Sequence, residues 1–349
     1  MSPKEDTRFL SIPPGAIVPG SLPRFKIYIR SSEGRYILWA LEGNVVTQEQ
    51  LNKLSENGHE EVYISLDEEV KYEEYLENHL TEIVNNRTIG NDQKVDIISR
   101  VSTNIVRNSF EASAETSFVD KRIVERVKKV VENVLLYIDQ YNSLPALSKL
   151  LGHDYQTYEH ATKVFWLTIA FLCRNHDVIE EVKKEAEDET YEEIIKQCGI
   201  AALLHDIGKA YIPKEILNKK GQLDELEWEK IKKHPLNGVA MLIDSDIPTF
   251  VKKAVLHHHE NYDGTGYPFN IEGENISCLA RIMRIIDVFD AMTSNRPYKK
   301  ALSPKEVVKI MVSHPYHKTH RDNGMRNCFD DNLLKKFIIL LGKIKVTRT

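Results

Sequence analysis

Histidines are concentrated in the second half of this 349-residue chain, and imidazole is a side chain that binds divalent metals. Ten of the 13 histidines lie from His160 onward. The strongest local motif is LLHDIGKAYIP at 203–213, where an apolar run ends in the adjacent pair His205 and Asp206. Adjacent side chains on a helix point about 100° apart. Both therefore reach one metal centre only if a helix end turns them inward or if Asp206 bridges two ions.

Other imidazoles and carboxylates accompany this pair. His160 lies near the start of a strongly apolar helix, His234 lies in KKHPLNG, and an unbroken histidine triplet occupies 257–259. Asp287 follows the apolar run IMRII, and Asp290 shares its helix face three positions later. Burying such groups without partners is costly, so we expect them to meet. We predict a metal site made of His160, His205, Asp206, His234, His258, His259 and Asp287.

The donor types indicate which metals this site would take. Imidazole and carboxylate without thiolate suit non-haem iron, manganese, nickel, cobalt or zinc, and they do not separate iron from manganese. The four cysteines form no CxxC pair, which argues against a thiolate zinc site or a redox motif. Seven ligands are more than one tetrahedral ion uses. Two ions about 3.5–4 Å apart, bridged by a carboxylate and a hydroxide, would use them all.

Two further motifs carry groups that suit a phosphate substrate. HHENYDGTGYP at 258–268 begins at two proposed ligands, its glycines permit unusual backbone angles, and Tyr267 presents a phenol. NRPYKKA at 295–301 places Arg296 and Lys299 three residues apart, and Lys209 belongs to the first motif. Cations beside two metals would stabilise phosphoryl oxygens in a transition state. The alternatives are an ordinary surface turn and a solvated basic face.

The elements that must position these groups are helices. From about Leu144 to the end, the pattern predicts successive helices without strand alternation. The acidic stretch 180–193 reads as a surface insertion between core helices. A helical connector is predicted from about Glu68 to Ile138, where apolar residues recur every three or four positions from Ile123 to Ile138. This connector either packs on the neighbouring domain or couples and dimerises the chain.

The N-terminal part has a different pattern. Residues 1–20 are rich in proline and glycine and are expected to be irregular. Period-two alternation predicts a strand in 25–32, and hairpin-like spacing predicts a second in 35–41. A capped helix is expected over 47–58 and a third strand over 60–66. The expected fold is therefore mainly α, with a small β-β-α-β domain first. We predict a regulatory or interaction domain at 1–66, a connector at 67–143 and a catalytic domain at 144–349.

Composition excludes several classes of protein. Apolar residues at 42% and charged residues at 28% are typical of a soluble globular chain. A net charge of −5 argues against a partner that is a nucleic-acid polymer. The sequence has neither a membrane-spanning apolar run nor an apolar signal segment. Together with scattered cysteines, these features predict a cytoplasmic protein that does not bind membranes.

The order of the motifs resembles that of the HD-GYP family, a branch of the HD-domain metal-dependent phosphohydrolases. These motifs are HDIGK, the HP that follows it, HHExxDGxGYP and DVFDAMTSxRPYK. The resemblance covers roughly residues 145–342. It implies a helical catalytic domain and a binuclear or trinuclear centre, with iron favoured over manganese. It also implies hydrolysis of cyclic di-GMP to pGpG and on to GMP.

The resemblance also implies a role for individual residues. The seven proposed ligands match the family's metal ligands, with Asp206 as the bridging carboxylate. The matching phosphate-contacting positions are Lys209, Arg296 and Lys299, and Tyr267 is the tyrosine of the signature. The carboxylates expected to orient water or ligands are Asp154 and Asp290. Members with three metals have a glutamate where Gln156 stands, so we predict two ions and pGpG as the main product.

Alternative functions remain open from the sequence. The same scaffold could hydrolyse cyclic GMP-AMP, (p)ppGpp or a nucleoside phosphate, although the GYP turn favours cyclic di-GMP. A non-enzymatic alternative is a cyclic-dinucleotide receptor or interaction module with weak turnover. Expected partners are a second copy of the chain, through the helical connector, and signalling proteins, through the N-terminal domain or the GYP loop.

Overall fold

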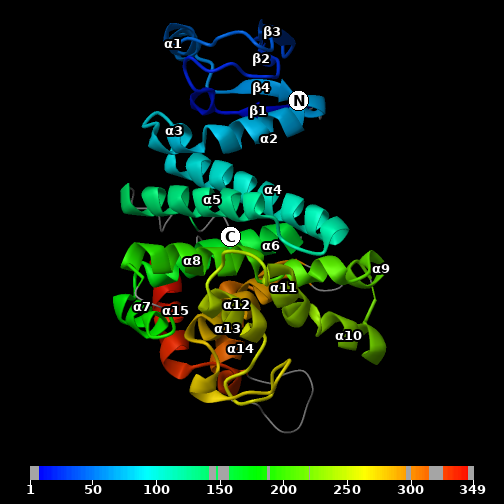
Figure 1. Ribbon diagram of the computed structural model, residues 1–349. Coiled ribbons are helices and arrows are strands. Elements are labelled where there is room, and N and C mark those ends of the chain that lie inside the picture. The colour runs from blue at the N-terminus through cyan, green and yellow to red at the C-terminus, as the bar shows by residue number, and fades with distance from the viewer. Residues whose placement is uncertain are drawn as a thin grey trace. The chain divides into compact units, whose positions relative to one another are not determined.

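The computed structural model describes the chain in seven parts, which are residues 8–140, 147, 157–186, 189–219, 221–295, 300–313 and 325–344. Two compact units are present, Met1–Val101 and Ser102–Thr349 (Figure 1). The boundary between them falls inside the predicted connector. The expected three-part organisation stays a prediction.

The first unit contains a four-stranded antiparallel sheet in the order β1-β4-β2-β3 (Figure 1). Its strands are β1 (Phe9–Ile12), β2 (Ile27–Arg30), β3 (Tyr36–Ala40) and β4 (Val62–Ser65). The three predicted strands are present. The prediction of an irregular segment was wrong for Phe9–Ile12, because β1 pairs with β4 from Phe9↔Ser65 to Ile12↔Val62. Four residues are too few to show alternation, and this pairing is not local in sequence.

Helix α1 (Gln48–Glu56) begins where the sequence predicted a capped helix. The Gln50 N–H donates to Thr47 Oγ1, and the Thr47 N–H donates to Gln50 Oε1, so two otherwise unpaired donors are satisfied. The helix buries Leu51 and Leu54. Its boundaries therefore follow from local chemistry.

The predicted helical connector is helical, but it is divided into four helices. They are α2 (Glu69–Asn78), α3 (Leu80–Asn85), α4 (Asn91–Thr116) and α5 (Lys121–Gln140). Helices α2 and α3 belong to the first unit, where the buried Phe25 ring meets Tyr72 and Tyr75 edge-on at 5.5 and 5.4 Å. The apolar face of α5 lies in the second unit. Its Tyr137 packs edge-on against Trp166 at 5.9 Å.

The described part of the second unit consists of helices and loops (Figure 1). The helices after α5 are α6 (Thr157–Leu172), α7 (His176–Lys183), α8 (Tyr191–Leu204), α9 (Lys214–Leu217), α10 (Glu225–Ile231), α11 (His234–Leu242), α12 (Thr249–His257), α13 (Cys278–Thr293), α14 (Pro304–Val312) and α15 (Asp331–Lys343). Helices α6, α8 and α13 are largely buried and form the core. The mainly-α prediction is confirmed. Among the described helices, none is long and apolar enough to cross a bilayer.

Candidate metal centre

The seven predicted ligands come together in the second unit, and helix ends position most of them. His205 and Asp206 follow α8 directly, His234 begins α11, and His258 and His259 follow α12. The others lie within helices, His160 in α6 and Asp287 in α13. The exposed fraction is 1% for His160, His205 and Asp206, 0% for His234 and His258, and 8% for Asp287. Residues separated by up to 127 positions thus share one buried site.

Asp206 stands between two groups of potential ligands. One group is Asp206, His234, His258 and His259, and the other is His160, His205 and Asp206. Within each group, one possible ligand atom per residue lies within 4.8 Å of the others. Each group thus presents several donor atoms at a spacing that suits coordination of one ion.

The two carboxylate oxygens of Asp206 face different histidines. Oδ1 lies 3.2 Å from His234 Nε2 and 3.8 Å from His258 Nε2. Oδ2 lies 3.4 Å from His205 Nε2 and 3.9 Å from His160 Nε2. This arrangement allows one carboxylate to serve both groups at once.

Three imidazoles are oriented by backbone carbonyls near helix ends. The Nδ1 atom of His205 lies 2.8 Å from the carbonyl oxygen of Ala202. The corresponding distances are 2.8 Å from His234 Nδ1 to Ile231 O and 2.6 Å from His258 Nδ1 to Val255 O. A carbonyl only accepts, so each Nδ1 carries the hydrogen. In the neutral ring, Nε2 then holds the lone pair, and Nε2 is the atom that faces Asp206.

His160 is oriented by a carboxylate. Its Nδ1 lies 2.7 Å from Asp290 Oδ2, and its Nε2 lies 3.0 Å from Asp287 Oδ1. The Ser294 hydroxyl donates to Asp290 Oδ1 at 3.2 Å, and Lys163 Nζ lies 3.9 Å from the same oxygen. A carboxylate behind an imidazole fixes its orientation and raises its basicity as a metal ligand.

The residues fit a divalent cation. Asp206 Oδ1 and His205 Nε2 are buried without a hydrogen-bond partner among the described residues. His234 Nε2 is close to Asp206 Oδ1, but the geometry is not that of a hydrogen bond. Lone pairs facing one another in a buried site repel unless a positive charge lies between them. Imidazole and carboxylate donors are those that non-haem divalent metals accept.

The protonation states also suit metal binding. Burial opposes ionisation of Asp206, but Lys209, His205 and His234 outweigh it and hold the pKa of this carboxyl well below its usual range. Burial lowers the pKa of His258 to about 4 and the pKa of His259 well below its usual range. At neutral pH the carboxylate is therefore ionised and these imidazoles are neutral, as metal coordination requires.

Lys209 brings a positive charge to this carboxylate. Its Nζ donates to Asp206 Oδ2 at 2.5 Å, and its side chain is 15% exposed. The ammonium therefore lies at the boundary between the buried ligands and solvent. A cation in this position is able to meet an anionic substrate.

The GYP turn is attached to the ligand histidines. The Tyr267 ring stacks on His259 with centroids 4.8 Å apart, and the Tyr267 N–H donates to the His259 carbonyl. A Cβ on Gly266 would lie 2.2 Å from Asn261 N and 2.4 Å from Glu260 Cα. Only glycine permits this approach, and Gly264 adopts a φ of +76°. Both glycines are thus required by the turn.

Two side chains near the site were not predicted. Arg284 Nη1 lies 3.3 Å from His259 Nδ1 and 3.7 Å from Asp287 Oδ2. Its position one helical turn before Asp287 was the available signal. The ring of Trp228, on α10, lies 6.4 Å from Tyr267 and is 44% exposed. Nothing in the sequence around Trp228 indicates this proximity.

Four residues for which the sequence analysis discussed a role at the site lie outside the described parts of the chain. They are Asp154, Gln156, Arg296 and Lys299. Their roles stay predictions. Residues 187 and 188 of the acidic stretch are also outside, while α7 and α8 contribute its two ends.

Comparison with known proteins agrees with this geometry. A family model described as an HD domain matches residues 171–322. The chain is 38% identical over 202 residues to a cyclic di-GMP phosphodiesterase of Pseudomonas aeruginosa, covering 58% of this chain and 43% of that protein. It is 31% identical over 205 residues to a 3′3′-cGAMP-specific phosphodiesterase of Vibrio cholerae, covering 57% and 38% respectively. The chain thus spans less than half the length of these curated relatives.

A solved structure supports the fold. An HDG"Y"P protein of Bdellovibrio bacteriovorus matches with a TM-score of 0.57 at 19% sequence identity, covering 96% of this chain and 99% of that one. This likeness extends to the architecture alone. The HD-domain match and the curated relatives agree with the resemblance of the motif order to the HD-GYP family.

Proposed function

We propose that this protein hydrolyses cyclic di-GMP to pGpG by metal-dependent phosphodiester cleavage. The observation that carries the proposal is the Asp206 carboxylate, whose two oxygens face different groups of histidines. The choice of substrate is supported by relatives that are named cyclic di-GMP phosphodiesterases.

We assign two divalent ions to the site, held by the seven residues His160, His205, Asp206, His234, His258, His259 and Asp287. Divalent ions held by these residues would supply Lewis-acid chemistry, which would make a water acidic enough to act as a nucleophile near neutral pH. Iron is favoured, with manganese as the alternative. No third ion is proposed, because Gln156 replaces the glutamate found in members with three metals.

The protein's own side chains prepare the site for this reaction. Asp206 fixes the separation between the two groups of ligands, and Asp290 holds His160 in the orientation that its role requires. Lys209 presents its ammonium to the phosphoryl oxygens, whose negative charge shifts in the transition state. Arg284 adds a second cation beside Asp287.

Trp228 and Tyr267 provide an aromatic surface for a guanine base. His259, Tyr267 and Trp228 form a continuous series of ring contacts from a metal ligand to a partly exposed indole. Every nucleobase presents a flat face that stacks on such rings. A substrate phosphate at the ligands would leave its base within reach of this surface. Phosphate contacts by Arg296 and Lys299 and a catalytic role for Asp154 stay predictions.

Cyclic GMP-AMP is the second candidate substrate, because several relatives are named 3′3′-cGAMP-specific phosphodiesterases. Hydrolysis of (p)ppGpp and a receptor role with weak turnover are the remaining alternatives. A cytoplasmic location, a homodimer through the helical connector and signalling partners of the N-terminal domain or GYP loop also stay predictions.

The test uses full-length protein purified without oxygen and loaded with iron or manganese. Elemental analysis should give about two ions per chain, and chromatography should show pGpG formed from cyclic di-GMP. Asp206→Ala should lose metal and activity together. Asp246→Ala, which removes an exposed surface carboxylate, is the matched control. Normal cleavage by the Asp206 variant would overturn the proposal, and a substrate panel would separate cyclic di-GMP from the other nucleotides.

A further inference from the structure

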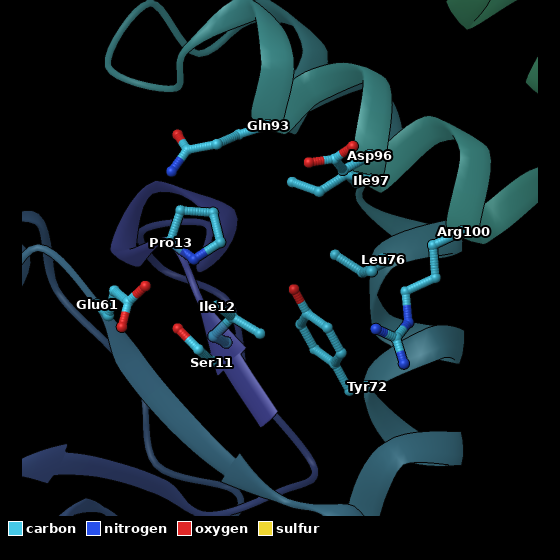
Figure 2. A pocket seen from close by; sticks show the side chains of 10 residues that line it. All are labelled: Ser11, Ile12, Pro13, Glu61, Tyr72, Leu76, Gln93, Asp96, Ile97 and Arg100. Atoms are coloured by element: carbon cyan, nitrogen blue, oxygen red, sulfur yellow. The ribbon is translucent and has the colours of Figure 1, made fainter. Parts of the chain in front are cut away.

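A cavity of about 270 Å³ lies within the N-terminal unit, outside the metal centre (Figure 2). The apolar part of its lining is formed by Ile12, Leu76 and Ile97, which are buried. These residues come from β1, α2 and α4. The cavity therefore has an apolar floor built from elements that are distant in sequence.

Tyr72 contributes a polar group to this floor. Its side chain is only 2% exposed, and its hydroxyl points into the cavity (Figure 2). Among the described residues, this hydroxyl has no hydrogen-bond partner. Burial raises the pKa of the phenol, so the hydroxyl keeps its proton. A hydroxyl that faces a cavity without a protein partner is a ready contact for a bound molecule, because it is able both to donate and to accept a hydrogen bond.

The ring of Tyr72 is held in place by its neighbours. Phe25 meets it edge-on with centroids 5.5 Å apart, and the Arg100 guanidinium carbon lies 5.9 Å from its centroid. The hydroxyl is therefore directed by packed side chains. A group placed in this way contributes to recognition without a large loss of rotamer freedom on binding.

The charged lining of the cavity is net negative. Arg100 is the cation of the lining, and it hydrogen-bonds Glu69, while its Nε lies 3.7 Å from Glu73 Oε1. Two carboxylates outside the lining, Glu69 and Glu73, thus accompany this cation. Glu61 and Asp96 add two more carboxylates, one on the β4 side and one on α4 (Figure 2). Such a field attracts cations and repels anions.

We propose that this cavity binds a small aromatic amine. The protonated amine would lie near Glu61 and Asp96, the ring would cover the apolar floor, and a polar group would meet the Tyr72 hydroxyl. The volume lies just below the range of about 300–1,000 Å³ that is common for ligand pockets, so a single-ring ligand is the right size. This proposal is independent of the reaction assigned to the metal centre.

The test is calorimetric titration of the full-length protein with three molecules that share one skeleton. Tyramine carries the amine, 4-ethylphenol is neutral, and 4-hydroxyphenylacetate carries a negative charge. We expect tyramine to bind most tightly and the anion to bind least. Failure of tyramine to bind at millimolar concentration, or equal binding of all three molecules, would overturn the proposal.

Variants locate the binding. Glu61→Gln and Asp96→Asn each remove one rim charge and should weaken tyramine binding by about fivefold. Tyr72→Phe should weaken it by a similar factor through loss of the hydroxyl contact. Glu49→Gln, an exposed carboxylate on α1, is the matched control and should leave affinity unchanged. If Tyr72→Phe disturbs folding, Glu61→Gln and Asp96→Asn still test whether tyramine binds in this cavity. Tyramine binding that is insensitive to both of them would refute this site.

Discussion

The first prediction concerns Gly208, two residues after the carboxylate shared by both ligand groups. A methyl group added there would lie 2.0 Å from the His234 carbonyl oxygen and 2.4 Å from Gly238 N. Ordinary contacts at such positions begin at 3.4 Å, so the two segments must separate by about 1.4 Å. The obstructing atoms are backbone atoms of α11, which cannot rotate aside. Gly208→Ala must therefore move α11 or the turn that follows Asp206.

This movement reaches the metal centre directly, because His234 begins α11. His234 Nε2 lies 3.2 Å from Asp206 Oδ1, and metal–ligand distances tolerate deviations of about 0.2 Å. A displacement several times larger should remove His234 from coordination. Forcing a methyl group into a packed region also costs about 1–3 kcal/mol of unfolding free energy. We expect Gly208→Ala to bind less metal and to unfold at a lower denaturant concentration.

The assay is elemental analysis of the loaded protein together with denaturant unfolding of the metal-free protein. Gly342→Ala in α15 is the control, since no described atom outside its own helix lies within 4 Å of the added carbon. Alanine is favoured over glycine in a helix by about 1 kcal/mol, so this variant should be at least as stable as wild type. Equal metal content and an equal unfolding midpoint for Gly208→Ala would refute the close packing of Gly208 on α11.

Three further predictions concern the same site. Asp290→Asn should lower metal affinity by about 10–100-fold, because it weakens the hold on His160, and unchanged affinity in a competition assay with a chelator would contradict this. Trp228→Ala should weaken cyclic di-GMP binding by about 1–3 kcal/mol through lost stacking. The control is Leu226→Ala, which changes an exposed neighbour and should leave binding normal. Equal affinities for both variants would show that Trp228 is not part of the substrate surface. In the metal-free protein the pKa of His258 falls from the usual 6.5 to about 4, so the unfolded chain binds more protons between these values. Stability should therefore decline as pH falls through this window, and thermal melting at pH 7 and pH 5 checks the sign.

Local patterns in the sequence predicted the helical class and named the seven candidate ligands. Apolar periodicity predicted the helices, and an ionisable group inside an apolar run, such as Asp287, indicated a partnered buried site. The capping box at Thr47 fixed a helix start in the same local way. Such features depend on residues within a few positions of one another, which is why a single sequence reveals them.

Other features depend on contacts between distant segments and had no local signal. Strand β1 exists because β4 pairs with it, and Trp228 lies near Tyr267 because α10 and the GYP turn pack together. The orientation of His205 depends on a carbonyl near the end of α8, and the sequence alone does not say which ring nitrogen is engaged. Motifs therefore named the residues, while tertiary packing decided which atoms face one another.

The shared carboxylate of Asp206 has a thermodynamic consequence. An ion bound on the Oδ1 side would change the charge that the Oδ2 side presents to a second ion, and linkage would make this influence equal in both directions. The two groups of ligands in the proposed centre would therefore not titrate as independent sites. A substitution such as His234→Ala, on the Oδ1 side, should also alter affinity on the side of His205, although these two histidines face different oxygens of the carboxylate.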